Sequence, residues 1–290
     1  MHGKILVGVD DRERSRDALA LGRLIAGKTG ATLIAVQAYS AAGDFPIPAD
    51  PTWDDAMYQV ALKVVADVIA GGPDGERAEA VHSSSPARGL HDLAEREQAD
   101  LIVVGSSERG ALGRLTAGST AHSLLSGAPC AVAVAPAGYA ERPEQRLETI
   151  GVAFDARPES DLALESAIDL ARSAGARVHL VTLAYPPDRP FLGEGPAPVD
   201  VPAMLESITE KMQAVQDAAV ARIPDDVEHS GQVFADPQVA LVHVEGVDVM
   251  VMGSRNYGPV RRVLLGSLAR QVMGSAPWPV IVVPRGAGGS

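Results

Sequence analysis

A glycine-bearing loop occurs twice in the sequence, and both copies combine residue types that can hold a phosphate group. Each loop follows an apolar run, keeps the spacing Gly-x4-Gly-x7-Gly-Ser and leads into a helical pattern. Glycine has no Cβ, so backbone N–H groups can approach a phosphate, and the free N–H groups of a helix start favour an anion. Turn and N-cap preferences also place glycine and serine at such positions, and this alternative stays open. The candidate residues are Gly105, Gly118, Ser119 and Thr120 in the first copy and Gly253, Gly266 and Ser267 in the second.

An aspartate comes directly after the first expected strand of each half. These residues are Asp10 and Asp155, while Gly105 and Gly253 come directly after the fourth expected strand. In an open parallel sheet, ligands bind outside the carboxyl ends of the strands, where the winding direction reverses. Asp10 and Asp155 are therefore candidates to contact a ligand, although capping of a turn or helix explains an aspartate there equally well.

The two loops belong to a longer internal repeat. The segment Asp100–Ser106 (Asp-Leu-Ile-Val-Val-Gly-Ser) reappears 148 residues later as Asp248–Ser254 (Asp-Val-Met-Val-Met-Gly-Ser). Earlier in each half the spacing is 145 residues, which indicates short insertions or deletions in loops. A period this long is typical of duplicated domains rather than of a solenoid. We expect unit 1 at residues 1–138, a linker at 139–147, unit 2 at 148–286 and a tail at 287–290.

Apolar runs alternate with helical patterns in unit 1, and unit 2 repeats the plan with a shorter helix at Pro237–Gly246. Continuous apolar strands between amphipathic helices predict an α/β fold with a parallel sheet covered on both faces. In unit 1 the expected strands are 5–9, 32–38, 79–82, 101–104 and 131–135, and the expected helices are 15–28, 54–69, 87–98 and 119–126.

Composition limits the classes of function. A net charge of −12 repels nucleic acids and anionic membranes, so we expect neither as a partner. The sequence has no apolar run long enough for a membrane helix and starts directly with a strand pattern, so we expect a cytoplasmic protein. The single cysteine, Cys130, lies in an apolar run, and the histidines are scattered without metal-ligand spacing, so no metal site is expected.

These motifs together resemble the universal stress protein family in its tandem form. The features that carry the resemblance are Val7-Gly8-Val9-Asp10, the serine five residues later, Gly30-Ala31, Val103-Val104-Gly105-Ser106, Gly118-Ser119, Ala128-Pro129-Cys130 and Val132–Pro136, most with counterparts in unit 2. The resemblance implies two tandem Rossmann-like units, each a five-stranded parallel sheet of order 3-2-1-4-5 with helices on both faces. It also implies that units pair through their fifth strands, and that some members bind ATP or AMP.

By the same resemblance, Asp10 or Asp155 would contact the adenosine, and Val104 or Met252 would line the base. ATP-binding members carry Gly-x2-Gly-x9-Gly-Ser/Thr, and both units of this chain lack the second glycine of that pattern. Glu108 stands there in unit 1 and brings a negative charge toward the phosphate, whereas Asn256 in unit 2 is neutral. Together with Arg255, Arg261 and Arg262, this favours unit 2 as the more complete site.

Two functions remain open from the sequence. The first is a stress-response or regulatory protein that binds an adenine nucleotide, ATP (with Mg²⁺) or AMP, without strong catalysis and with at most slow ATP hydrolysis. The second is a dimerisation or interaction scaffold whose nucleotide sites are degenerate. In both cases unit 1 is expected to pair with unit 2 through Ala131–Ala135 and Val280–Val283, and apolar edge strands favour a homodimer.

Overall fold

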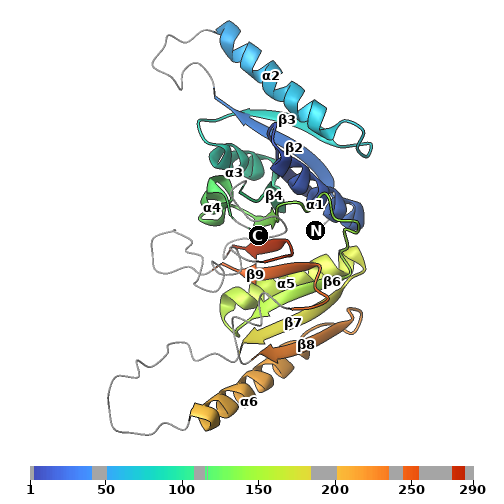
Figure 1. The fold of residues 1–290 in the computed structure, drawn as a ribbon, viewed down its shortest axis with the longest axis vertical. Helices are drawn as coiled ribbons and strands as arrows, with labels where there is room; N and C mark the ends of the chain where they lie inside the picture. Colours follow the sequence, from blue (N-terminus) through green and yellow to red (C-terminus); the bar gives the residue numbers. More distant parts are fainter. Residues whose placement is uncertain are drawn as a thin grey trace, which may run out of the picture.

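One ten-stranded sheet runs through both halves of the chain in the computed structural model (Figure 1). The structure describes residues 3–40, 51–107, 115, 117–183, 201–234, 244–254 and 276–284. The strand order is β3-β2-β1-β4-β5-β10-β9-β6-β7-β8. Each half therefore has the order 3-2-1-4-5, and all neighbouring strands within a half are parallel. This confirms the expected α/β fold of two repeated units.

The described elements of unit 1 follow the expected alternation closely. They are β1 (Lys4–Gly8), α1 (Glu13–Thr29), β2 (Thr32–Tyr39), α2 (Pro51–Ile69), β3 (Arg77–His82), α3 (Pro86–Glu97), β4 (Leu101–Gly105), α4 (Ser119–Leu125) and β5 (Ala131–Ala135).

Unit 2 repeats the plan in its described residues. Its elements are β6 (Thr149–Phe154), α5 (Pro158–Ala174), β7 (Arg177–Leu183), α6 (Val201–Val220), β8 (His229–Phe234), β9 (Val249–Gly253) and β10 (Val280–Val283). Most of the shorter helix expected at 237–246 lies outside the described residues.

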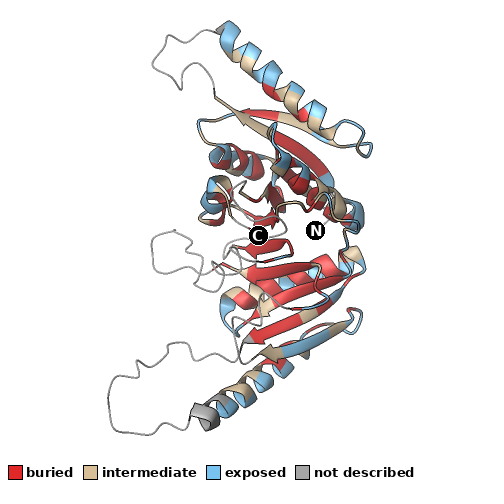
Figure 2. Cartoon of the chain, in the orientation of Figure 1, coloured by how far each residue is buried: buried red, intermediate tan, exposed pale blue. Residues whose placement is uncertain are grey.

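The central strands β4, β5, β9 and β10 are apolar along almost their whole length because helices cover both faces of the sheet, whereas the outer strands β3 and β8 also carry exposed polar residues. One core lies between the sheet and α1, α2, α5 and α6, and a second lies between the sheet and α3 and α4. Figure 2 shows that buried residues concentrate in the central strands, whereas the outer helices α2 and α6 are largely exposed. No helix in the described parts of the chain is long and apolar enough to cross a membrane.

The two units meet in the middle of the sheet. β5 and β10 pair antiparallel, with Val134 opposite Val280 and Val132 opposite Val282. Helices α1 and α5 also contact each other on the same face of the sheet. The larger core therefore continues from one unit into the other.

The chain between the units makes contacts with both units. Both carboxylate oxygens of Asp17 on α1 accept backbone hydrogen bonds, from Ala140 N at 2.8 Å and Gly138 N at 3.0 Å. Further along, Arg142 lies 5.1 Å from the ring centroid of Tyr139 and donates a hydrogen bond to the carbonyl of Pro277. The segment after β5 is thus tied to α1 and to the residues that precede β10.

Some repeated residues serve the fold. Gly30 and Gly175 end α1 and α5 with φ values of 72° and 65°, a left-handed conformation that glycine adopts without strain. Asp100 accepts a hydrogen bond from Gly3 N at 3.1 Å, and Asp248 accepts one from Thr149 N at 2.9 Å. Each aspartate directly precedes the fourth strand of its unit and binds the backbone at the start of the first strand. This contact accounts for the aspartate's place in the repeat.

Candidate functional site

The turn between β1 and α1 is built around the carboxylate of Asp10. Ser15 Oγ accepts a hydrogen bond from Asp10 N at 2.7 Å and donates one to Asp10 Oδ1 at 2.8 Å. The backbone N of Arg12 donates to the same Oδ1 at 3.1 Å. Ser15 is buried, so this reciprocal pair fixes the turn that leads into α1. Asp10 therefore has the capping role that the sequence left open.

Arg14 holds the other carboxylate oxygen of Asp10. Its Nε donates to Asp10 Oδ2 at 3.0 Å, and its Nη2 also contacts Oδ2. Burial by itself raises the pKa of the Asp10 carboxyl, but the hydrogen bonds from Arg14 and Ser15 and the charge of Arg14 outweigh burial, and the pKa lies below its ordinary value. Asp10 is thus a carboxylate at neutral pH, and Arg14 balances its charge.

A small cavity lies beside this ion pair, at the carboxyl ends of β1, β2 and β4. Its volume is about 100 Å³. Segments far apart in the sequence converge on it: the turn after β1, the end of β2, the start of α3, the end of β4 and the start of α4. The lining residues are Gly8, Val9, Asp10, Arg14, Ser15, Val36, Gln37, Ala38, Pro86, Leu90, Val104, Gly105, Gly118, Ser119, Thr120 and Ala121.

All six unit 1 residues that the sequence singled out border this cavity. They are Asp10, Val104, Gly105, Gly118, Ser119 and Thr120. The sequence reasoning missed Arg14 and the apolar wall formed by Val36, Ala38 and Leu90. Arg14 follows Asp10 by four residues near a helix start. This spacing is typical of ion pairs, so the sequence alone could have indicated Arg14.

Two glycines at this cavity have different reasons to be glycine. A Cβ on Gly105 would overlap the backbone carbonyl of Arg14, so Gly105 allows the first turn of α1 to pack against the end of β4. Gly118 is extended (φ −73°, ψ 174°), and a Cβ there would meet Ser107 at an ordinary distance of 3.7 Å. Packing therefore explains Gly105, whereas among the described residues no close contact demands glycine at 118.

The matching turn of unit 2 has longer described contacts at its aspartate and carries an acidic residue in place of Arg14. Asp155 N donates to Ser160 Oγ at 3.3 Å, and Asp155 Oδ2 lies 3.6 Å from Arg157 Nε. Ser160 Oγ donates to the carbonyl of Arg157 at 2.9 Å. The side chain of Asp155 is 39% exposed, compared with 26% for Asp10. Glu159 occupies the place that Arg14 has in unit 1.

Gly253 has the same structural role as Gly105. A Cβ on Gly253 would overlap the backbone carbonyl of Glu159, so α5 packs on the end of β9 as α1 packs on β4. Met252 is buried, on the same face of the sheet as Val104. Gly266 and Ser267, the other candidates of unit 2, lie outside the described residues, as do Glu108, Asn256, Arg255, Arg261 and Arg262.

Comparison with known proteins agrees with this architecture. The model of the universal stress protein family matches residues 1–136 and again 146–284. The chain belongs to the universal stress protein family. It is 31% identical over 296 residues to a universal stress protein of Mycobacterium tuberculosis, covering 97% of this chain and 96% of the relative. A universal stress protein of Mycolicibacterium smegmatis is 32% identical over 232 residues, which covers 77% of this chain and 74% of the relative.

The fold of this universal stress protein also matches a solved structure along its whole length. A universal stress protein from Archaeoglobus fulgidus superposes with a TM-score of 0.63 at 20% identity, covering 98% of both chains. At this identity the likeness concerns the fold alone. Together, the two family matches and the strand order establish a tandem member of the family.

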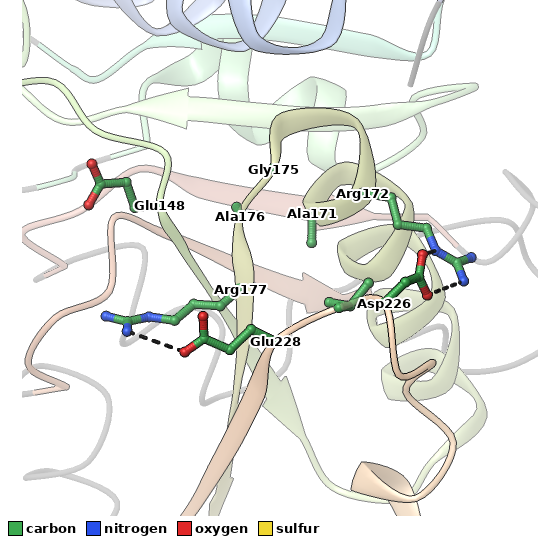
Figure 3. Close-up of a pocket in the computed structure, with 9 residues that line it drawn as sticks. Glu148, Ala171, Arg172, Gly175, Ala176, Arg177, Asp226 and Glu228 are labelled. Atoms are coloured by element: carbon green, nitrogen blue, oxygen red, sulfur yellow. Dashed lines mark hydrogen bonds and ion pairs between the residues drawn. The ribbon is translucent and has the colours of Figure 1, made fainter.

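A larger hollow lies at the opposite, amino ends of β6, β7 and β8 (Figure 3). Its volume is about 540 Å³. Arg172 pairs with Asp226 at 2.8 Å and Arg177 lies 3.9 Å from Glu228, so both arginines along its wall are engaged by carboxylates. Parallel α/β sheets bind ligands at the carboxyl ends of their strands. Despite its smaller volume, the cavity beside Asp10 is therefore the better candidate site.

Reactive groups are scarce in the parts of the chain that the structure describes. There, no group of three or more His, Cys, Asp or Glu residues could hold a metal ion. Cys130 is buried, and burial together with the charge of Asp100 raises the pKa of its thiol to about 12. A thiol with so high a pKa is unreactive at neutral pH.

Proposed function

We propose that the protein is a stress-response or regulatory protein that binds an adenine nucleotide, ATP or AMP, in the cavity beside Asp10. The observation that carries this proposal is the convergence of the six unit 1 candidates on one cavity. Because these residues come from three separate segments of the chain, their meeting is a property of the fold rather than of local sequence. The resemblance to ATP- and AMP-binding members supplies the class of ligand.

Each wall of the cavity suits a part of the ligand. Val36, Ala38 and Val104 form an apolar surface for the base. Asp10 lies where a carboxylate can accept hydrogen bonds from ribose hydroxyl groups. Gly118 exposes its backbone to the cavity, so a phosphate can approach without meeting a Cβ. ATP would bring Mg²⁺ with it, and the nucleotide's own oxygens would be the main ligands of that ion.

The chemistry of the cavity favours binding over catalysis. Asp10 has a lowered pKa, and its two oxygens accept hydrogen bonds from Ser15, Arg12 and Arg14. A carboxylate held in this way is a weak general base, since catalytic bases work best with a pKa near the working pH. We therefore expect at most slow ATP hydrolysis.

Titration calorimetry with ATP and AMP tests the proposal. The purified protein is first freed of any co-purified nucleotide by unfolding and refolding, and its refolding is checked by circular dichroism. We expect saturable heat with a dissociation constant below about 1 mM, which corresponds to at least about 4 kcal/mol of binding free energy. GTP is the matched control for base selectivity. The absence of heat for ATP and AMP up to millimolar concentrations would contradict the proposal.

One observation favours the second candidate function, an interaction scaffold with degenerate nucleotide sites. The described residues enclose about 100 Å³, whereas small-molecule sites are typically about 300 Å³ or larger. A nucleotide would have to widen this cavity or extend beyond it. The same titration decides between the two functions, because a scaffold gives no heat with either nucleotide.

We also propose the expected homodimer, with a restriction on its interface. β5 and β10 pair with each other within the chain, so their edges are already used. A homodimer must therefore form through another surface, such as the outer strands β3 and β8. Light scattering of the full chain at two protein concentrations measures the mass directly. A constant mass of about 30 kDa, that of a single chain, would exclude the dimer.

A further inference from the structure

The first turns of α1 and α5 take matching positions because of two glycines. Gly105 lets the carbonyl of Arg14 lie against the end of β4, and Gly253 lets the carbonyl of Glu159 lie against the end of β9. Arg14 and Glu159 are both half-buried, and each precedes a buried serine, Ser15 or Ser160. The fold thus places a cation at one site and an anion at the equivalent place of the other.

Among the described residues that line the unit 1 cavity, Arg14 is the only cationic one. Two of the five N–H groups of its guanidinium face Asp10 Oδ2. The remaining N–H groups have no hydrogen-bond partner among the described residues. A guanidinium held on one edge by a carboxylate keeps its orientation, so its other edge can bind a phosphate without a further loss of side-chain freedom.

Asp10 alone would oppose an anionic ligand. A negative charge next to a phosphate raises the cost of binding, and the lowered pKa keeps Asp10 charged at neutral pH. Arg14 removes this obstacle because it cancels the charge of Asp10 and adds donors at the same edge of the cavity. At the corresponding turn of unit 2, the residue four positions after Asp155 is Glu159, which has no N–H donors to offer a phosphate from its side chain.

We propose that Arg14 is the residue that makes the unit 1 cavity select phosphorylated nucleosides over adenosine. The proposal rests on the function proposed above and names the side chain that binds the phosphate. Ionic hydrogen bonds between a guanidinium and a phosphate are among the stronger polar contacts in proteins, and adenosine has no anionic group to form them.

The test compares adenosine, AMP and ATP as probes by titration calorimetry of the full chain. In Arg14→Met we expect affinity for AMP and ATP to fall about tenfold or more, while affinity for adenosine changes less than about twofold. Arg14→Lys keeps the positive charge but loses the planar set of N–H donors of the guanidinium. It should therefore retain more of the preference for AMP over adenosine than Arg14→Met does. Arg14→Glu copies the charge of unit 2 into unit 1 and should give the largest loss for AMP and ATP.

Arg16→Met is the matched control. Arg16 is an exposed arginine on the same helix that does not line the cavity, so this variant removes the same charge without touching the site. We expect it to bind all three probes like the original protein. Thermal unfolding of each variant checks that the fold is intact.

The outcomes separate this inference from the proposed function. Equal losses for adenosine, AMP and ATP in Arg14→Met would assign Arg14 a purely structural role and overturn the inference, while nucleotide binding itself would stand. Unchanged binding of all three probes in Arg14→Met and Arg14→Glu would overturn it as well. No binding of any probe by the original protein would overturn the proposed function and the inference with it.

Discussion

The turns that follow β1 and β6 take equivalent places in the two units but differ in backbone conformation and in the contacts of their aspartate. In unit 1, Asp10 is held by Ser15 on one oxygen and by Arg14 on the other. In unit 2, Asp155 has a longer ion pair with Arg157, and Ser160 donates its hydroxyl to a backbone carbonyl instead. Ala156, next to Asp155, has a positive φ of 57°, a conformation that costs a residue with a Cβ some strain.

This difference teaches that duplicated geometry does not imply duplicated chemistry. At both Gly105 and Gly253 a helix approaches a strand end so closely that a Cβ would meet a backbone carbonyl, so packing accounts for the glycine in both units. The side chain at the approaching turn is free to change, and here it is Arg14 in one unit and Glu159 in the other. The described residues therefore favour unit 1 as an anion site, whereas the sequence favoured unit 2 from residues outside the described ranges.

The largest expected effect is on nucleotide affinity and comes from aspartate substitutions at equivalent glycines of the two units. In Gly118→Asp, a new carboxylate lies at the cavity beside Asp10, so we expect binding of ATP and AMP by unit 1 to be abolished. In Gly266→Asp, the unit 1 site is untouched and nucleotide still binds. Titration calorimetry of both variants measures affinity and stoichiometry. Loss of binding in Gly266→Asp alone would support unit 2 and contradict the assignment to unit 1.

A second comparison tests what the two units have in common. Gly105→Ala and Gly253→Ala each force a Cβ against a backbone carbonyl, so we expect each to lower the free energy of unfolding by about 1–3 kcal/mol. Gly118→Ala is the control, because its Cβ would meet only ordinary contacts. Urea denaturation measures all three variants. A destabilisation by Gly118→Ala as large as that of Gly105→Ala would refute the distinction between packing and site glycines.

A third prediction concerns the segment that links the units, which unit 1 holds through Asp17. Asp17→Ala removes the acceptor of two backbone N–H groups in the segment after β5, so we expect a loss of about 1–2 kcal/mol in unfolding free energy. Asp17→Asn should lose less, since one oxygen remains to accept. Limited proteolysis then compares cleavage between residues 136 and 147 in the variants. Unchanged stability and unchanged cleavage in Asp17→Ala would contradict the structural role of Asp17.

The smallest expected effect is on pH dependence and again contrasts Asp10 with Asp155. Because the pKa of Asp10 is lowered on folding, its stabilisation is present above the ordinary pKa of aspartate and is lost as the pH falls through the lowered value. Asp10→Asn should therefore destabilise the protein at pH 7, and the gap to the original protein should narrow in acid.

Asp155→Asn is the matched control. Asp155 is more exposed and has the longer ion pair, so we expect Asp155→Asn to lower the stability at pH 7 less than Asp10→Asn does. Thermal unfolding between pH 7 and pH 3 gives both curves. An Asp10→Asn gap that widens toward acid would have the wrong sign and would refute the assigned cause.

Much of the fold could be predicted because local patterns and packing agree. The apolar run from Leu101 and the glycine at position 30 indicate a buried strand and a helix end whatever the rest of the chain does. The strand order came from the family resemblance, because periodicity says nothing about which strands are neighbours. At the site, the residue types of Asp10 and Gly118 pointed to a ligand, but the reason for Gly105 could not be read from the sequence. Its Cβ conflict is with Arg14, which lies 91 residues away in the chain.

The sequence by itself determined the duplication, the α/β class and the candidate residues of each unit, because these follow from repeats and from short-range preferences. Only the tertiary structure decided which of those residues meet, and it added Arg14 and the apolar wall from β2 and α3 to the cavity. It also separated Gly105 and Gly253, which packing requires, from Gly118, where a Cβ would meet only ordinary contacts among the described residues. The physical reason is that a binding site is defined by contacts between distant segments, and such contacts depend on how strands are ordered and how closely helices approach them.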